Sequence, residues 1–309
     1  MKYEIHEVKP ILENLLVKGQ LNIFVGSGIS IDSGIPTWNG LIDEFLEMAK
    51  KIKFVNLADK KRIEQIYFDA QTRKAQSRFN PIEVATVLKR SLKEAQEISI
   101  SVSQAYKDYK NWIGKIFGDK LPNEKHKDIV STDYKYILTS NYDDLLQAAA
   151  YDMGFLDFSA QTFDYKSQTE IIKKVNSGEP AIIHVHGLVN KLEIDELIFT
   201  KEDYNRMILK SYPGFSFALR MLFTRYSTLF VGYGASDPHL EEVLEELSEY
   251  FPLVDKSFSL PENFLVTLRD KADIILEKYK ERVGTSLILI DDFRQYNELL
   301  THLKTIKGR

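Results

Sequence analysis

Hydrophobic and polar positions follow two periods along the chain. Over residues 8–18 and 38–51, apolar residues recur at three- and four-residue spacing, which predicts two amphipathic helices. Between them, residues 21–25 form a short, mainly apolar run that stops at Gly26. A run of this length, bounded by glycine, is typical of a strand buried on both faces.

The second half of the chain alternates apolar runs with helical periods. Strands are predicted at 136–139, 181–185, 226–231, 264–268 and 286–290. Helices are predicted at 143–153, 240–250, 271–282 and 294–304. Strands that alternate with helices imply right-handed crossovers. We therefore expect an α/β fold with a Rossmann-like, mainly parallel sheet and helices on both faces.

Residues 55–130 interrupt this alternation. The segment is rich in lysine, helical in character and without a strong strand signal. No internal repeat and no proline-rich linker divides the chain. We therefore expect one domain over residues 1–309, with a helical insertion at 55–130.

Small and polar residues follow four of the predicted strands directly. They are Gly26 after the first strand, then Ser140 to Asp143, His186 and Gly187, and Gly232 to Gly234. In parallel sheets, ligands bind in the crevice outside the carboxyl ends of the strands. The pattern predicts that four distant segments line one crevice.

Composition narrows the classes of function. The net charge of -4 lacks the basic excess of a nucleic-acid-binding surface. The 309 residues include no cysteine, which excludes disulfides and cysteine-ligated zinc. No apolar run approaches the ~20 residues that span a bilayer, and no signal peptide is visible. We expect a soluble, cytoplasmic protein without a metal and without direct contact to nucleic acid or membrane.

The loop after the first strand matches none of three familiar nucleotide or nucleophile motifs. Gly26 and Gly28 fit the start of G-x-G-x-x-G, but Ile31 stands where the third glycine belongs. The loop also lacks the lysine of a P-loop and the G-x-S-x-G order of a nucleophile elbow. Neither hydride transfer nor nucleotide hydrolysis is indicated, and the loop taken alone is also consistent with a structural turn.

Four motifs in order resemble the sirtuin family. The family's GAGIS-x-x-SGIPDFRG is similar to residues 26–40, and its T-Q-N-I-D is similar to residues 139–143. Its catalytic H-G matches His186 and Gly187, and its glycine-rich strand end is similar to residues 232–238. Each motif is weak alone, but the four occur in the family's order, and the resemblance covers most of the chain outside the expected insertion.

Two departures point to one branch of that family. Sirtuin deacylases commonly hold a four-cysteine zinc module, and the family's Asp-Phe-Arg is replaced by Thr37-Trp38-Asn39. The chain therefore resembles the sirtuin-like NAD hydrolases of bacterial antiphage defence, which have a helical insertion instead of zinc. The resemblance implies cleavage of the nicotinamide–ribose bond of NAD+ to nicotinamide and ADP-ribose, with NAD+ as substrate and no metal.

The resemblance also implies site residues. Asn141 is expected to orient the ribose or water, Asp143 to hold the carboxamide or stabilise positive charge, and His186 to act as general base. The expected NAD+ contacts, in which small residues offer donors to the pyrophosphate, are Gly26, Ser27, Gly28, Ser30, Pro36, Trp38, Ser140, Gly232 and Asp237.

Each role has a structural alternative. Asn141 and Asp237 suit helix caps, Asp143 suits the positive end of the following helix, and Trp38 suits the core. His184 and His186 are expected to face opposite sides of their strand, with His184 in the core and His186 in the crevice beside Gly187.

Two further functions stay open at this point. One is an NAD-dependent protein deacylase or ADP-ribosyltransferase, and the other is a non-catalytic module that senses NAD or ADP-ribose. Because unregulated NAD+ cleavage harms the host, we expect control by a homo-oligomer, a regulatory partner protein, an additional sensor domain or an allosteric nucleotide.

Overall fold

An eight-stranded parallel sheet forms the centre of the computed structural model, which describes residues 1–51, 111–189, 196–208, 211–235, 237–254, 260–279 and 284–306, with scattered residues between 61 and 89. The strand order is β1-β8-β7-β6-β2-β3-β5-β4. The strands are β1 (Lys2–Glu4), β2 (Leu21–Val25), β3 (Ile137–Thr139), β4 (Thr162–Asp164), β5 (Ile182–His184), β6 (Ser227–Val231), β7 (Asn263–Leu268) and β8 (Thr285–Ile290).

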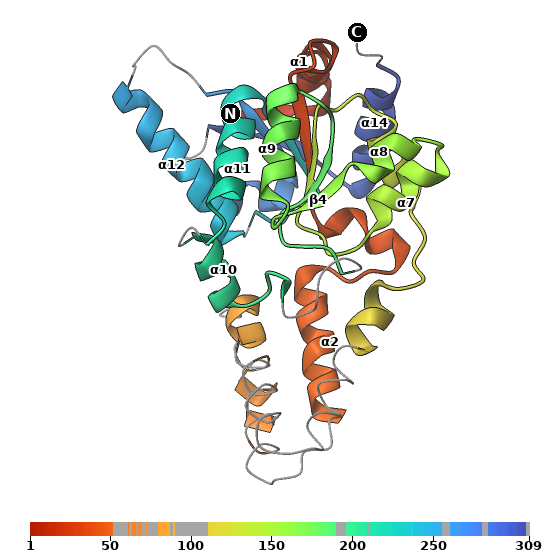
Figure 1. Ribbon diagram of the computed structural model, residues 1–309, viewed down its shortest axis with the longest axis vertical. Coiled ribbons are helices and arrows are strands. Elements are labelled where there is room, and N and C mark those ends of the chain that lie inside the picture. Colours follow the sequence, from red (N-terminus) through yellow and green to blue (C-terminus); the bar gives the residue numbers. More distant parts are fainter. Residues whose placement is uncertain are drawn as a thin grey trace.

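Helices cover both faces of the sheet (Figure 1). One face packs against α1 (Ile5–Val17), α6 (Glu124–Val130), α7 (Leu145–Asp152) and α14 (Phe293–Lys304). The other packs against α9 (Gln168–Ser177), α10 (Lys201–Ile208), α11 (Pro213–Arg225), α12 (Pro238–Val254) and α13 (Ala272–Tyr279). The remaining elements are α2 (Trp38–Lys51), α8 (Leu156–Ala160) and the short 3₁₀ turns η1 (Ser27–Ile29), η2 (Ile31–Ser33) and η4 (Arg269–Lys271).

Alternation along β2 explains why its residues are apolar on both faces. Ile23 and Val25 point into the cluster beneath α1 and α14, whereas Phe24 points into the cluster beneath α11 and α12. Successive side chains of a strand face opposite sides, so a sheet covered twice needs an apolar residue at almost every position.

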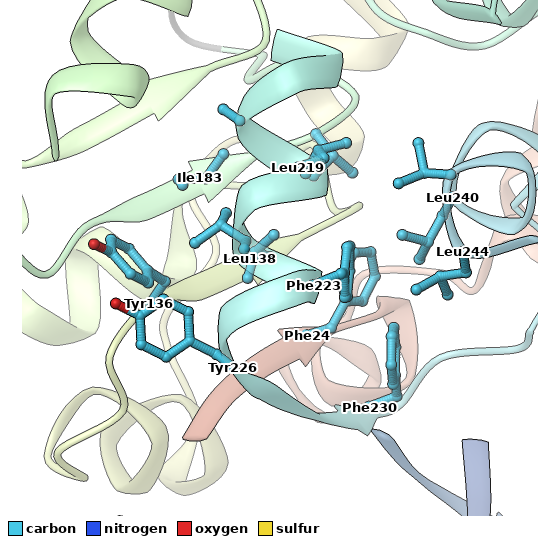
Figure 2. Close-up of a cluster of buried hydrophobic side chains, with 14 of the residues drawn as sticks. Phe24, Tyr136, Leu138, Ile183, Leu219, Phe223, Tyr226, Phe230, Leu240 and Leu244 are labelled. Carbon is cyan, nitrogen blue, oxygen red and sulfur yellow. The ribbon is translucent and has the colours of Figure 1, made fainter. Parts of the chain in front are cut away.

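The core beneath α11 and α12 is built from aromatic and aliphatic side chains of several elements (Figure 2). Phe24 of β2 and Phe230 of β6 have ring centroids 5.2 Å apart, and Phe223 of α11 stacks nearly parallel to Phe230. Leu240 and Leu244 of α12 close this cluster from the side. Burial of such side chains contributes about 1.5–3 kcal/mol each, so the cluster fixes α11 and α12 on the sheet.

The predicted α/β fold and parallel sheet are confirmed. Each of the six predicted strands is present within one residue of its expected bounds, and each predicted helix outside 55–130 is present. β1 and β4, which are three-residue strands at the two edges of the sheet, were not predicted from the sequence, and neither were α8 to α11. β1 (KYE) and β4 (TFD) lack the apolar runs that identified the equally short β3 and β5, so only pairing with a neighbouring strand identifies them.

The expected insertion at 55–130 lies largely outside the described residues. Within it, residues 81–86 and 111–117 are helical. Side chains from both segments pack with α2 in a second hydrophobic cluster that includes Phe45 and Ile113. The last part of the range, α6, packs against the sheet as part of the main domain. Because most of the remaining range lies outside the described residues, the insertion and its bounds stay predictions. Within the described ranges, no helix is long and apolar enough to cross a membrane.

Candidate active site

The sheet order brings four sequence-distant loops together. β6, β2, β3 and β5 are consecutive neighbours in the sheet, and their last residues are in register. Val25 pairs with both Val231 and Thr139, and Thr139 pairs with His184. The chain passes from β2 to β3 on one side and later returns to β6 on the other, so β2 is a switch point where α/β sheets bind ligands.

The glycines of the first loop allow two loops to approach closely. A Cβ atom added at Gly26 would overlap the carbonyl oxygen of Gly232 and lie 2.7 Å from Cα of Tyr233. At Gly28 it would lie 2.9 Å from Cα of Gly232, whose own φ of +61° favours glycine. Backbone contact between the loops after β2 and β6 therefore requires glycine at all three positions.

This packing corrects the expected role of the loop's N–H groups. The N–H of Gly26 donates to the carbonyl of Val231 at 2.8 Å, and that of Gly28 donates to the carbonyl of Gly232 at 3.0 Å. The N–H of Ser30 donates to the carbonyl of Ser27 at 3.1 Å. Three N–H groups that we expected to face a pyrophosphate are thus already used inside the protein.

Ser30 is fully buried and joins three other side chains. Its hydroxyl donates to Oδ2 of Asp143 at 3.0 Å and accepts from Nδ2 of Asn141 at 3.1 Å. Nε2 of His126 lies 3.2 Å from the same oxygen. His126, from α6, is a residue that the sequence analysis missed, because it falls in the lysine-rich range expected to be an insertion. The pattern Asn123-x-x-His126 was the only available signal, and it indicates a helix start.

The side-chain amide of Asn141 is oriented by two hydrogen-bond acceptors, and both of them face its Nδ2. Its Nδ2 also faces the carbonyl oxygen of Gly26, at 3.3 Å, and a carbonyl can only accept a hydrogen bond. Oδ1 therefore points away, and it is buried without a hydrogen-bond partner among the described residues. Asn141 does not cap the next helix, since the N-cap of α7 is Asp144. An unsatisfied buried acceptor calls for a donor, which in a binding site is supplied by ligand or water.

Asp143 is connected to Asn141 through the hydroxyl of Ser30. Its Oδ1 accepts the N–H of Leu145 at 3.2 Å, as expected near the start of a helix, and Oδ2 accepts from Ser30. Burial raises the pKa of Asp143 to about 6, although both hydrogen bonds favour the charged form. Both oxygens are thus used within the protein, in agreement with the structural alternative for Asp143.

His186 and Asp237 form a buried pair from different loops. Nε2 of His186 lies 2.6 Å from Oδ2 of Asp237, and each side chain is about 5% exposed or less. Oδ1 of Asp237 accepts the N–H groups of His239 and Leu240 at 3.1 and 3.0 Å, so Asp237 also caps α12. Burial by itself raises the pKa of Asp237, but His186, His239 and the N–H of Leu240 together outweigh burial and hold that pKa below its usual range.

The expected placement of the two histidines needs a correction. Residues two apart on one strand share a face, so alternation does not separate His184 from His186. The difference arises because β5 ends at His184 and the chain turns over residues 185–186. Nδ1 of His184 lies 3.0 Å from the carbonyl oxygen of Asn141, whereas His186 lies against Asp237.

Aromatic rings enclose His186. The ring of Tyr204 in α10 meets the imidazole edge-on at 5.3 Å between centroids, and Tyr142 lies 6.5 Å away. The hydroxyl of Tyr142 donates to the carbonyl of Ile198 at 2.5 Å, and the N–H of Ile198 donates to the carbonyl of His186 at 3.0 Å. Neither tyrosine was singled out from sequence, because their proximity to His186 depends on the fold.

The other predicted contacts are half-buried around these groups. Trp38 begins α2 and meets the ring of Phe199 edge-on at 5.0 Å, with Tyr142 6.5 Å away, so it belongs to the second hydrophobic cluster. Intermediate exposure is shared by Ser27, Pro36, Trp38, Ser140 and Gly232. Across the described ranges, no group of three or more His, Asp or Glu side chains is arranged to hold a metal ion.

Comparison with known proteins gives one family and several relatives. Residues 135–288 match the model of the SIR2-like domain. The chain is 25% identical over 229 residues to "Defense-associated sirtuin 2" of Bacillus subtilis, an alignment of 73% of this chain with 19% of that protein. It is 24% identical over 231 residues to "NAD(+) hydrolase ThsA" of Cytobacillus dafuensis, covering 73% and 37% respectively. With "NAD(+) hydrolase ThsA" of Enterococcus faecium the identity is 21% over 236 residues, covering 74% and 40%.

The matches cover only part of each relative, since the aligned segments span 19–40% of the lengths of those three proteins. The matched domain nevertheless contains Asn141, Asp143, His186 and Asp237. The loop of residues 26–40 lies outside it. Residues 135–288 of the chain therefore match the SIR2-like domain family.

Proposed function

We propose that the protein hydrolyses NAD+ at the nicotinamide–ribose bond and releases nicotinamide and ADP-ribose. One observation carries the proposal: Asn141 Oδ1 is a buried acceptor without a partner among the described residues, at the carboxyl end of a parallel sheet. The SIR2-like domain and the relatives named NAD(+) hydrolase support the same reaction.

Cleavage of the nicotinamide–ribose bond requires only the kinds of side chain that the site contains. Nicotinamide leaves as a neutral molecule, so the reaction needs no general acid and no pair of carboxylates of the glycosidase type. The protein has to bind the ribose, exclude bulk water and deliver one water molecule to the anomeric carbon. Asn141 Oδ1 can accept a hydrogen bond from a ribose hydroxyl or from that water.

His186 is the proposed general base. With Nε2 held against the carboxylate of Asp237, the orientation of the imidazole is restricted. Removal of a proton from water or from a ribose hydroxyl leaves His186 positively charged, and Asp237 then forms a buried ion pair with it. In this proposal Asp237 acts through His186 rather than as a ribose contact.

The remaining contacts are assigned to binding. We assign the half-buried Ser27, Ser140 and Gly232 to the pyrophosphate and ribose, and Pro36 and Trp38 to the nicotinamide side. Gly26 and Gly28 serve by bringing the loops together, and Ser30 serves through Asn141. No residue in this assignment depends on a metal.

A cytoplasmic effector of antiphage defence is the biological role that fits this reaction. Depletion of NAD+ stops the metabolism of an infected cell, so the activity has to be restrained before infection. We propose restraint through a homo-oligomer, a regulatory partner protein or a further sensor domain. A specific activity that stays constant from nanomolar to micromolar protein would argue against assembly as the switch.

The decisive test is a time course of NAD+ cleavage at several protein concentrations. Nicotinamide and ADP-ribose are quantified for the wild type, Asn141→Ala and His186→Ala, with Asp292→Asn at the start of α14 as a control whose carboxylate contacts Arg294 and the N–H of Gln295. We expect equimolar products from the wild type and the control, and a loss of at least ~10²-fold for both site variants.

Other outcomes separate the alternatives. Acetyl-ADP-ribose formed from an acetylated peptide would favour a deacylase. NAD+ binding by calorimetry without turnover at any concentration would favour a sensor. Absence of binding would contradict the proposed site itself.

A further inference from the structure

We propose that His126 is a positioning residue of the active site: through Ser30 it fixes the amide of Asn141 so that Oδ1 faces the ligand. The proposal rests on the proposed function for its kinetic consequence, but its structural part stands on contacts among four buried side chains. None of the motifs that resemble sirtuins contains His126, which lies in α6 between the motifs at 26–40 and 139–143 and outside the matched domain.

The contacts of His126 determine which nitrogen carries its proton. The backbone N–H of Asn123 donates to Nδ1 at 3.2 Å, so Nδ1 is the acceptor nitrogen. In a neutral imidazole the other nitrogen is then protonated, and Nε2–H points to Ser30 Oγ at 3.2 Å. Burial lowers the pKa of His126 to about 4, so the ring stays neutral at physiological pH.

Ser30 is thereby fully used as a hydrogen-bonding group. A hydroxyl has two acceptor positions and one proton. The acceptor positions face Nε2–H of His126 and Nδ2–H of Asn141, so the proton is directed to Oδ2 of Asp143. The direction of each hydrogen bond is fixed by the partner of Ser30: the carboxylate of Asp143 can only accept, and the amide N–H of Asn141 can only donate.

Loss of the hydrogen bond from His126 to Ser30 would change the orientation of Asn141. Without the Nε2–H donor, one acceptor position of Ser30 is left empty in a fully buried environment, and the hydroxyl can turn away from Asp143 or Asn141. The amide of Asn141 is then held by the carbonyl of Gly26 alone, at 3.3 Å. Loss of orientation by about 1 Å is enough to reduce catalysis strongly, even where the substrate still binds.

His126 also has a purely structural contact, which the experiment has to separate. Asn123 and His126 form a reciprocal capping box at the start of α6, so any change at position 126 weakens that cap. His126→Leu removes both the cap contact and the donor to Ser30. His126→Gln weakens the cap contact but keeps a side-chain N–H donor of similar reach.

The kinetic test compares kcat and KM for NAD+ in the wild type and both variants, with the midpoint of denaturant unfolding measured in parallel. We expect the leucine variant to lose about 10-fold or more in kcat with KM changed less than ~2-fold, and the glutamine variant to regain most of it. Equal losses in both variants, or an unchanged kcat in the folded leucine variant, would overturn the proposal.

A second readout does not depend on NAD+ cleavage. In ¹⁵N-histidine-labelled protein, the signals of His126 are identified as those missing from His126→Gln. Two-bond ¹H–¹⁵N correlations should show a neutral ring protonated at Nε2 from pH 6 to 8. A ring protonated at Nδ1 or at both nitrogens would contradict the positioning argument. If the wild type cleaves no NAD+, the proposed function fails, and this measurement still decides the structural part.

Discussion

Nε2 of His186 and Oδ2 of Asp237 lie 2.6 Å apart, although 51 positions separate the two residues along the chain. One follows β5 and the other precedes α12, and the sheet order brings their loops to the same edge. A histidine ring that lies against a buried carboxylate from another loop has a restricted orientation. Removing the charge of Asp237 therefore tests directly whether its contact with His186 is needed for NAD+ cleavage.

Asp237→Asn should separate catalysis from folding. Asparagine can still accept the N–H groups of His239 and Leu240, so the cap of α12 is kept, but the charge beside His186 is lost. We expect NAD+ cleavage to fall on the order of 10²-fold. Because the folded-state pKa of Asp237 is depressed, loss of its charge should also lower the unfolding midpoint, while the retained cap of α12 keeps the variant folded. The matched control is Asp292→Asn, which retains the cap of α14 in the same way and should leave cleavage unchanged.

Asp143→Asn should change how stability depends on pH. Because burial raises the folded-state pKa of Asp143 to about 6, the folded protein binds a proton that the unfolded chain releases near pH ~3.9. Its ionisation thus costs stability as pH rises from about 4 to 6, up to roughly 3 kcal/mol. Relative to the wild type, the variant should be more stable at pH 7.5 than at pH 4.5. Urea unfolding at both pH values measures this, and an equal difference at both would contradict it.

Gly26→Ala should destabilise the protein through the loop contact. The added methyl group meets the backbone of Gly232 and Tyr233, which cannot move as a flexible side chain does. We expect a loss of about 1–3 kcal/mol in guanidinium unfolding. Gly114→Ala is the matched control: nothing lies within 4 Å of the added Cβ, and its helical position should make the variant up to ~1 kcal/mol more stable.

Lys89→Met should be costly because Lys89 and Asp203 form a buried ion pair at 3.2 Å, with side chains 7% and 5% exposed. Burial raises the pKa of Asp203, but Lys89 and Thr200 outweigh it and lower that pKa. Without the lysine, the buried carboxylate of Asp203 keeps its charge but loses the positive charge of Lys89 beside it. The free energy of unfolding should therefore fall by roughly 3 kcal/mol. The exposed pair of Lys2 and Asp273 supplies the control, since Lys2→Met should change the unfolding midpoint little.

The pH dependence of that variant gives an additional check. A carboxyl whose folded pKa is depressed stabilises the fold above its unfolded pKa, and this stabilisation is lost as pH falls through the folded pKa. The stability difference between the wild type and Lys89→Met should therefore shrink as the pH is lowered below about 4. A difference that stays constant down to pH 3 would mean that the ion pair is not its source.

The sequence predicted those parts of the site that lie at strand ends. Apolar runs such as that ending at Val25 are local, and parallel strands place their carboxyl ends at one edge, so Asn141 and His186 could be identified beforehand. His126 could not, since its helix shows only a cap signal. Its relation to Ser30 arises from the packing of α6 against α7 and the sheet.

The sequence by itself determined the α/β class, six of the eight strands and the presence of glycine at three close contacts, because these depend on local period and on backbone sterics. Only the tertiary structure decided what each polar group contacts. In the folded protein, the N–H groups of Gly26 and Gly28 donate to the carbonyls of Val231 and Gly232. Asp237 caps α12 and also lies against His186. His126 contacts Ser30, which in turn contacts Asn141. Hydrogen bonds act over about 3 Å and in one direction, so their partners are set by the fold rather than by spacing along the chain.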